Sequence, residues 1–97
     1  MSWTDSLIWA LGHPDGDRAV MAARSLGRLR APEAAPALRA VVEAGADVYL
    51  RAEALLSVIA ISGPDSLRPW LVRLSQSGPL RVREIAREAL GGSRRGA

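Results

Sequence analysis

The sequence contains no cysteine, lysine, asparagine or phenylalanine, and a single histidine. Without cysteine, neither a disulfide framework nor a thiolate zinc site can stabilise the chain. The apolar stretch near the N-terminus stops at Gly12-His13-Pro14 and follows no basic segment, so it predicts neither a signal peptide nor a membrane span. We therefore expect a soluble cytoplasmic protein.

Motifs of catalytic chemistry are missing as well. The sequence has no HExxH, no P-loop and no glycine-rich dinucleotide fingerprint. His13 precedes a proline in a predicted turn, and the nearby Asp15 and Asp17 are expected to cap a helix. A metal would need further ligands that this neighbourhood does not supply. The sequence predicts a protein that is not an enzyme and that binds neither metal nor cofactor.

The basic residues are thirteen arginines against ten acidic residues, which gives a formal charge of +3. A bias towards arginine, alanine, glycine and leucine is typical of a GC-rich genome. The charge therefore permits nucleic-acid binding but does not demand it. At 97 residues the chain is long enough for one domain.

An internal repeat becomes visible when the sequence is shifted by 32 residues. Apolar, small and proline positions then agree in type, although identities are few. The aligned sets are Arg18, Ala22 and Leu26 with Leu50, Ala54 and Val58 and with Val82, Ala86 and Leu90, and also Leu29 with Ile61 and Pro32 with Pro64. Such agreement is typical of stacked structural units.

The helical periodicity of apolar residues predicts two helices in each unit. Prolines and acidic residues mark expected helix starts, and glycines mark expected ends. The pattern predicts helices over 3–11, 17–29, 33–44, 48–61, 65–76 and 80–91, with Trp70 in the core. Short links favour antiparallel neighbours. The predicted fold is all-α, a short right-handed α-solenoid of about three helical hairpins that forms one domain over 1–91, followed by a disordered polar tail over 92–97.

The repeat resembles the HEAT-like repeat of the phycobilisome-lyase type. The resemblance rests on residues 13–17 with Ala22, Ala23, Leu26, Gly27 and Leu29, on residues 32–38, on Asp47, Leu50, Arg51 and Ala54, and on Val82, Arg83, Ala86, Ala89, Leu90 and Gly91. It implies that the second helix of each hairpin lines a concave surface. It also implies a ladder of Asp and Arg between units, which we expect to be broken where the first unit has Arg18-Ala19. The resemblance specifies a fold but no function, since such repeats occur in lyases, DNA-repair enzymes and adaptors.

The middle second-layer helix carries an apolar stripe outside its core positions. The stripe consists of Tyr49, Ala52, Leu56 and Ile59; the equivalent positions are Asp17, Val20, Arg24 and Gly27 in the first unit and Arg81, Glu84, Glu88 and Gly91 in the last. An apolar centre between charged flanks is typical of a protein-binding groove. The alternative is that the middle repeat is simply buried more deeply.

The first predicted helix places Trp3, Leu7 and Leu11 on one face, whereas Trp9 points the other way. An exposed tryptophan is a common interface anchor. The alternative is that Trp9 folds over the end of the array as a cap.

We therefore predict a non-catalytic adaptor or scaffold that binds a protein through the concave layer. The predicted site residues are Tyr49, Leu56, Ile59, Trp9, Arg24, Arg28 and Glu88. One alternative is nucleic-acid backbone binding through Arg24, Arg28 and Arg30 with Arg94 and Arg95; another is a lyase-associated accessory role. A homodimer through the ends of the array is also considered, because Leu7, Ile8, Val82 and Ile85 are expected near the open ends.

Overall fold

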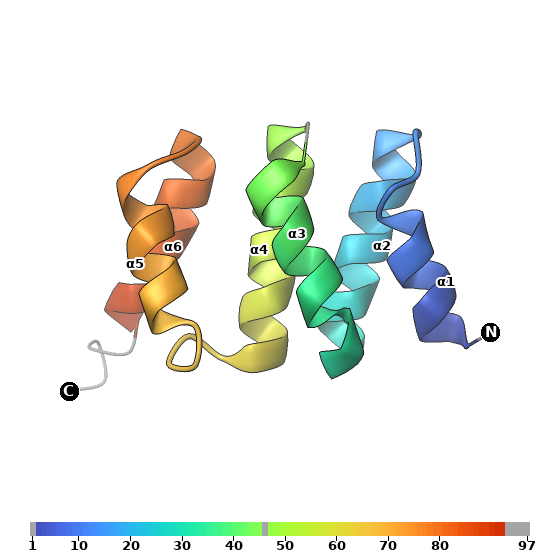
Figure 1. Ribbon diagram of the computed structural model, residues 1–97, viewed down its shortest axis with the longest axis horizontal. Helices are drawn as coiled ribbons and strands as arrows, with labels where there is room; N and C mark the ends of the chain where they lie inside the picture. The colour runs from blue at the N-terminus through green and yellow to red at the C-terminus, as the bar shows by residue number, and fades with distance from the viewer. Residues whose placement is uncertain (1, 46, 93–97) are drawn as a thin grey trace.

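The computed structural model describes residues 2–45 and 47–92 (Figure 1). Within these residues it contains six α-helices, one short 3-10 helix and no strand. The elements are α1 (Trp3–Ala10), α2 (Gly16–Leu29), η1 (Pro32–Ala34), α3 (Ala35–Ala44), α4 (Val48–Ser62), α5 (Arg68–Gln76) and α6 (Leu80–Gly92). The all-α prediction is confirmed. Most of the predicted tail, residues 93–97, lies outside the described residues.

Side-chain caps fix the starts of three helices. Ser2 and Asp5 form a reciprocal capping box at α1, in which the Asp5 amide donates to the Ser2 hydroxyl at 3.1 Å. Asp15 accepts from an amide of α2, and Asp47 accepts from the Tyr49 amide of α4, both at 3.0 Å. These caps satisfy amide groups that have no partner within the helix, so they set where each helix begins.

The fifth helix begins later than the sequence predicts. We expected it from residue 65, but residues 64–67 form turns and α5 starts at Arg68. The Ser66 hydroxyl donates to the carbonyl oxygens of Ser62 and Gly63, at 2.7 and 3.2 Å, and this local bonding competes with helix formation. Pro69 then falls in the first turn of α5, where its missing N–H costs nothing.

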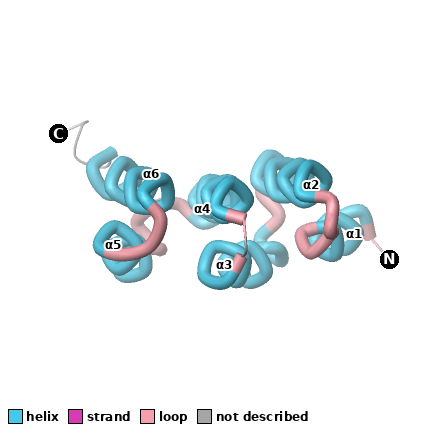
Figure 2. The backbone as a smooth tube through the Cα atoms, turned by 90° about the horizontal axis from the view of Figure 1, so that it is seen from above, coloured by secondary structure: helices cyan, strands magenta, loops and turns pink. Residues whose placement is uncertain are grey.

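The helices form two layers (Figure 2). The second helices of the three hairpins, α2, α4 and α6, lie side by side in one layer, and α1, α3 and α5 lie in the other. Neighbours in the α2–α4–α6 layer pack directly on each other, whereas the helices of the other layer lie farther apart. The array is therefore a short solenoid with α2, α4 and α6 on its inner side.

Small residues allow α2 and α4 to approach closely. Ala22, Ala54 and Ala86, the repeated alanines, are almost fully buried. A Cβ added to Gly27 would lie 2.6 Å from the Ser57 oxygen, so only glycine fits there. Larger side chains fill the space between the layers: Leu26, Leu38, Val42, Leu55, Val58, Leu71 and Val82.

The predicted ladder between units does not form. Asp47 caps its own helix, and the Arg51 Nε donates to the Val42 carbonyl oxygen at 2.8 Å, within the same repeat. Arg83, the equivalent of Arg51, has a buried Nε with no hydrogen-bond partner among the described residues. The prediction is wrong because Asp47 and Arg51 bond to groups of their own hairpin, and the Arg83 Nε forms no hydrogen bond within the described residues.

Candidate protein-binding surface

The exposed side of the α2–α4–α6 layer, called the inner face below, is the candidate site. Its residues recur at helical spacing and in the same register on each helix. They are Asp17, Arg24 and Arg28 on α2, Tyr49, Leu56 and Ala60 on α4, and Arg81 and Glu88 on α6, all of them exposed. The sequence-predicted rim residues Arg24, Arg28 and Glu88 therefore share one face with Leu56.

The centre of the inner face is apolar and accessible. Leu56 is 43% exposed and Tyr49 is 56% exposed, so the middle repeat does not bury these side chains. Ala52, by contrast, is 4% exposed, and Ile59 is half-buried against the core. Glu53 marks the flank of α4 that faces α2, because it accepts a hydrogen bond from Arg24. Ala52 and Ile59 lie on the opposite flank of α4, which faces α6. The predicted stripe is therefore narrower than expected, because close packing in the inner layer covers one of its edges.

Arg24 connects α2 to α4 across the inner face. Its guanidinium donates to the Tyr49 hydroxyl at 2.6 Å and to the Glu53 carboxylate at 3.0 Å. Its charge also lies 5.9 Å from the centre of the Tyr49 ring. The hydrogen bond and charge of Glu53 raise the pKa of Arg24. This set of contacts orients Tyr49 and partly neutralises Arg24.

A groove of ≈ 490 Å³ lies between α2 and α4 on this face. Leu56, Ser57, Ala60 and Gly27 line it together with three arginines, Arg24, Arg28 and Arg30. Among the described residues Arg28 and Arg30 form no ion pair. Arg30 is held beside the groove by a left-handed backbone conformation (φ 50°) at the end of α2. The groove therefore combines an apolar lining with two unpaired positive charges.

The charge of the inner face reverses along the array. The position occupied by Arg24 on α2 is Leu56 on α4 and Glu88 on α6. The position occupied by Asp17 on α2 is Tyr49 on α4 and Arg81 on α6. Each row thus carries opposite charges at its two ends and an apolar side chain in the middle.

A model of HEAT repeats matches residues 4–91, nearly the whole chain. The chain belongs to the HEAT-repeat family. No curated protein and no solved structure is significantly similar to it. The match is to HEAT repeats in general, so the phycobilisome-lyase type remains a prediction. HEAT repeats generally mediate protein interactions as scaffolds and are generally not catalytic.

Trp9 lies on α1, away from the inner face of this HEAT array. Its side chain is 73% exposed and meets His13 edge-on, with ring centres 6.2 Å apart. His13 in turn accepts a hydrogen bond from the Asp15 amide at 2.9 Å. A tryptophan exposed to this extent does not cover the end of the array. The structure therefore separates Trp9 from the other predicted site residues.

Trp3 is also 73% exposed, whereas Leu11 is buried and Leu7 is half-buried. The face that these residues share is therefore packed at Leu7 and Leu11 but not at Trp3. The reason is its position: Trp3 is the first residue of the outermost helix, and no described element lies beyond it.

The C-terminal end also differs from the expectation. Val82 is 0% exposed and Ile85 is 5% exposed. Both residues belong to the buried core, so they do not supply the exposed apolar surface expected at this end, where Leu80 is 58% exposed instead. The structure therefore does not support an end-to-end homodimer through Val82 and Ile85.

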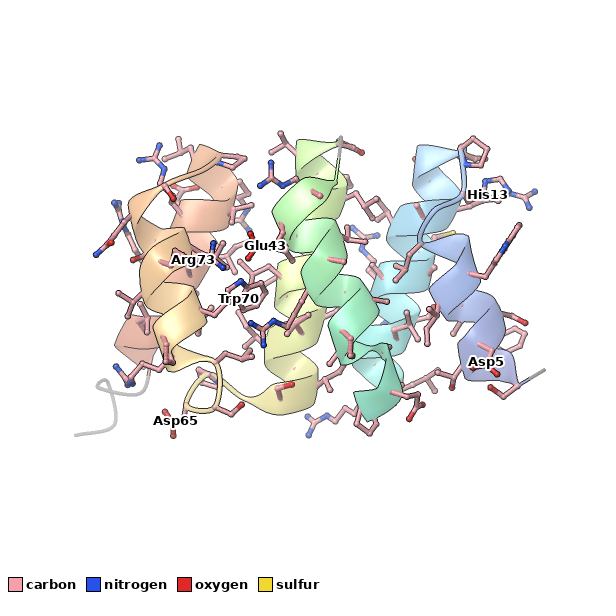
Figure 3. The ribbon with its side chains drawn as sticks, in the orientation of Figure 1. Asp5, His13, Glu43, Asp65, Trp70 and Arg73 are labelled. Atoms are coloured by element: carbon pink, nitrogen blue, oxygen red, sulfur yellow. The ribbon has the colours of Figure 1, made fainter. Side chains whose placement is uncertain are left out.

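A polar cluster that the sequence did not predict joins α3 to α5 in the outer layer (Figure 3). Trp70 is buried as expected, but its indole N–H donates to Glu43 at 2.6 Å. Arg73 donates to the same carboxylate at 2.5 Å, and the Arg39 guanidinium lies 4.5 Å from the Trp70 ring centre. The hydrogen bonds from Arg73 and Trp70 lower the pKa of Glu43. The only sequence signal was i, i+4 and i, i+3 spacing, which places Arg39 with Glu43 and Trp70 with Arg73.

The rest of the described chain offers no metal-binding group of three or more histidine, cysteine or acidic residues. None of its helices is long and apolar enough to cross a membrane.

Proposed function

We propose that this HEAT-repeat protein is a non-catalytic scaffold that binds a protein through its inner face. Tyr49, Leu56 and the exposed part of Ile59 form the apolar centre, and Arg24, Arg28 and Glu88 form the polar rim. The observation that carries the proposal is the exposure of Leu56 and Tyr49, 43% and 56%, in the middle of an ordered helical layer. An accessible apolar centre within a charged rim is the composition of a protein interface.

Nucleic acid is the second candidate, because Arg24, Arg28 and Arg30 line one groove. A phosphate backbone requires unpaired cations along its path. Arg24 is already paired with Glu53, and exposed Glu84 and Glu88 lie farther along the same layer. Tyr49 is the one aromatic residue of the inner face, so there is no row of rings for base stacking. These features favour a protein partner.

Co-purification from the lysate of the native host distinguishes the two candidates. The tagged chain is used as bait, with and without nuclease and at low and high salt. The proposal predicts a discrete protein that persists after nuclease treatment and at raised salt. Nucleic acid that is lost at high salt, with no protein retained, would contradict it and would assign the groove to phosphate binding.

A further inference from the structure

We infer that the protein bound by the inner face is a second copy of this chain, placed face to face about a two-fold axis parallel to the helices. The inference rests on the proposed function, since it names the partner of the same surface. It is carried by the charge reversal along the two rows of the inner face.

The symmetry operation explains why the reversal matters. Rotation about an axis parallel to the helices keeps every residue at its own height and exchanges the two ends of the array. The α4 helices of the two copies then face each other, and α2 of each copy faces α6 of the other. A two-fold interface of this kind is self-complementary only if α2 and α6 carry matching groups at each height.

The two charged rows meet this condition. In the first row, Arg24 of one copy, which also pairs with Glu53 of its own chain, faces Glu88 of the other, and in the second row Asp17 faces Arg81. Arg28 has no charged counterpart on α6, because residue 92 is glycine. The rows have opposite polarity, since α2 supplies the cation in one and the anion in the other. A partner that is uniformly acidic or basic would be repelled by one of the two rows. A second copy satisfies both, and each pair occurs twice.

The apolar residues fall on the axis. Leu56 of one copy then lies opposite Leu56 of the other, and Tyr49 opposite Tyr49, on the two sides of the axis. Arg24 holds the Tyr49 ring through its hydroxyl, which fixes the ring before association. A preformed apolar centre reduces the entropy that binding must overcome.

The dimensions are sufficient. The Cα framework measures 42 × 24 × 17 Å, and the inner face is one of the two broad sides, 42 by 24 Å. A stable interface needs about 800 Å² from each partner. A rectangle of these Cα dimensions covers about 1,000 Å², so an interface of standard size has to use most of the inner face.

The test is sedimentation equilibrium of the full chain, with charge variants of the second row. The wild-type chain is expected to form a dimer. Arg81→Glu places an acid opposite Asp17 at two symmetric sites, and we expect it to raise the dimer dissociation constant about tenfold. The double variant Asp17→Arg with Arg81→Glu restores the pairs with reversed sign and should recover dimerisation.

Arg87→Glu is the matched control. Arg87 is an exposed residue of α6 that lies outside the two rows and undergoes the same charge change. Circular dichroism confirms that each variant is folded; an acid at residue 81 lies in the first turn of α6, where the helix dipole favours it. A strictly monomeric wild type at high concentration overturns the inference. Arg81→Glu and Arg87→Glu that raise the dimer dissociation constant equally also overturn it. A double variant that stays monomeric does the same.

These failures are distinct from a failure of the proposed function. A monomer that still retains a different protein through Leu56 would overturn self-association alone. A chain that neither dimerises nor retains any protein would overturn both.

Discussion

Gly27 on α2 lies against Ser57 on α4 so closely that a Cβ at residue 27 would come within 2.6 Å of the Ser57 oxygen and 3.0 Å of its Cα. The Ser57 hydroxyl at this contact donates to the Ala23 carbonyl oxygen at 2.6 Å. The contact fixes the distance between α2 and α4, and with it the shape of the groove on the inner face.

Gly27→Ala is expected to destabilise the fold. Alanine favours the helix by about 1 kcal/mol, but overpacking against a backbone atom costs about 1–3 kcal/mol. We expect a net loss of up to about 2 kcal/mol in the free energy of unfolding, measured by urea denaturation. Gly91→Ala is the control at the equivalent repeat position, where a new Cβ meets nothing within 4 Å. If both variants have a higher free energy of unfolding than wild type, residue 27 does not lie as close to Ser57 as described.

Arg30 ends α2 with a positive φ of 50°, which glycine adopts at lower cost. Arg30→Gly should therefore raise the free energy of unfolding by about 0.5–1 kcal/mol. A decrease in stability would show that the Arg30 side chain makes interactions worth more than the backbone strain. The same denaturation experiment with Arg28→Gly, in the regular helix, should show a loss of about 1 kcal/mol instead.

Stability should fall in acid partly because of Glu43. Arg73 and Trp70 lower its folded pKa, so its contribution is present above the unfolded value of about 4.3 and is lost as pH falls through the folded pKa. Glu43→Gln should therefore be less stable than wild type at neutral pH, and the difference should shrink as pH decreases. Urea denaturation at a series of pH values from neutral to acidic measures this difference in stability. Glu84→Gln, at an exposed residue past the first turn of α6, should track wild type throughout. A difference that does not change with pH would argue against the ion pair.

Much of the fold was predictable because it depends on local spacing. The 32-residue shift and the helical period placed all six helices and the buried alanines, since these follow from which side chains recur along one chain. The exceptions have local causes too: Ser66 delays α5, and Trp3 has no neighbour beyond it.

The site was predictable only in part. Leu56 and Tyr49 are exposed as expected, but Ile59 is half-buried because α4 packs directly on its neighbours. The contacts of Arg24 with Glu53 and of Trp70 with Glu43 join residues 29 and 27 positions apart. Such pairs depend on the rotation between successive repeats, which periodicity within one helix does not determine.

Leu56→Asp tests the central claim most directly, with Val72→Asp as its matched control. Leu56 is 43% exposed on the inner face, and Val72 is 39% exposed on α5 in the other layer. Protein retained from lysate by each folded variant is compared with that retained by wild type, and dimerisation is compared in the same way. We expect Leu56→Asp to abolish most of the binding while helical content by circular dichroism is unchanged, and Val72→Asp to bind as wild type does. Binding that Leu56→Asp leaves intact, or an unfolded Leu56→Asp chain, would contradict the assignment of the inner face as a protein-binding surface.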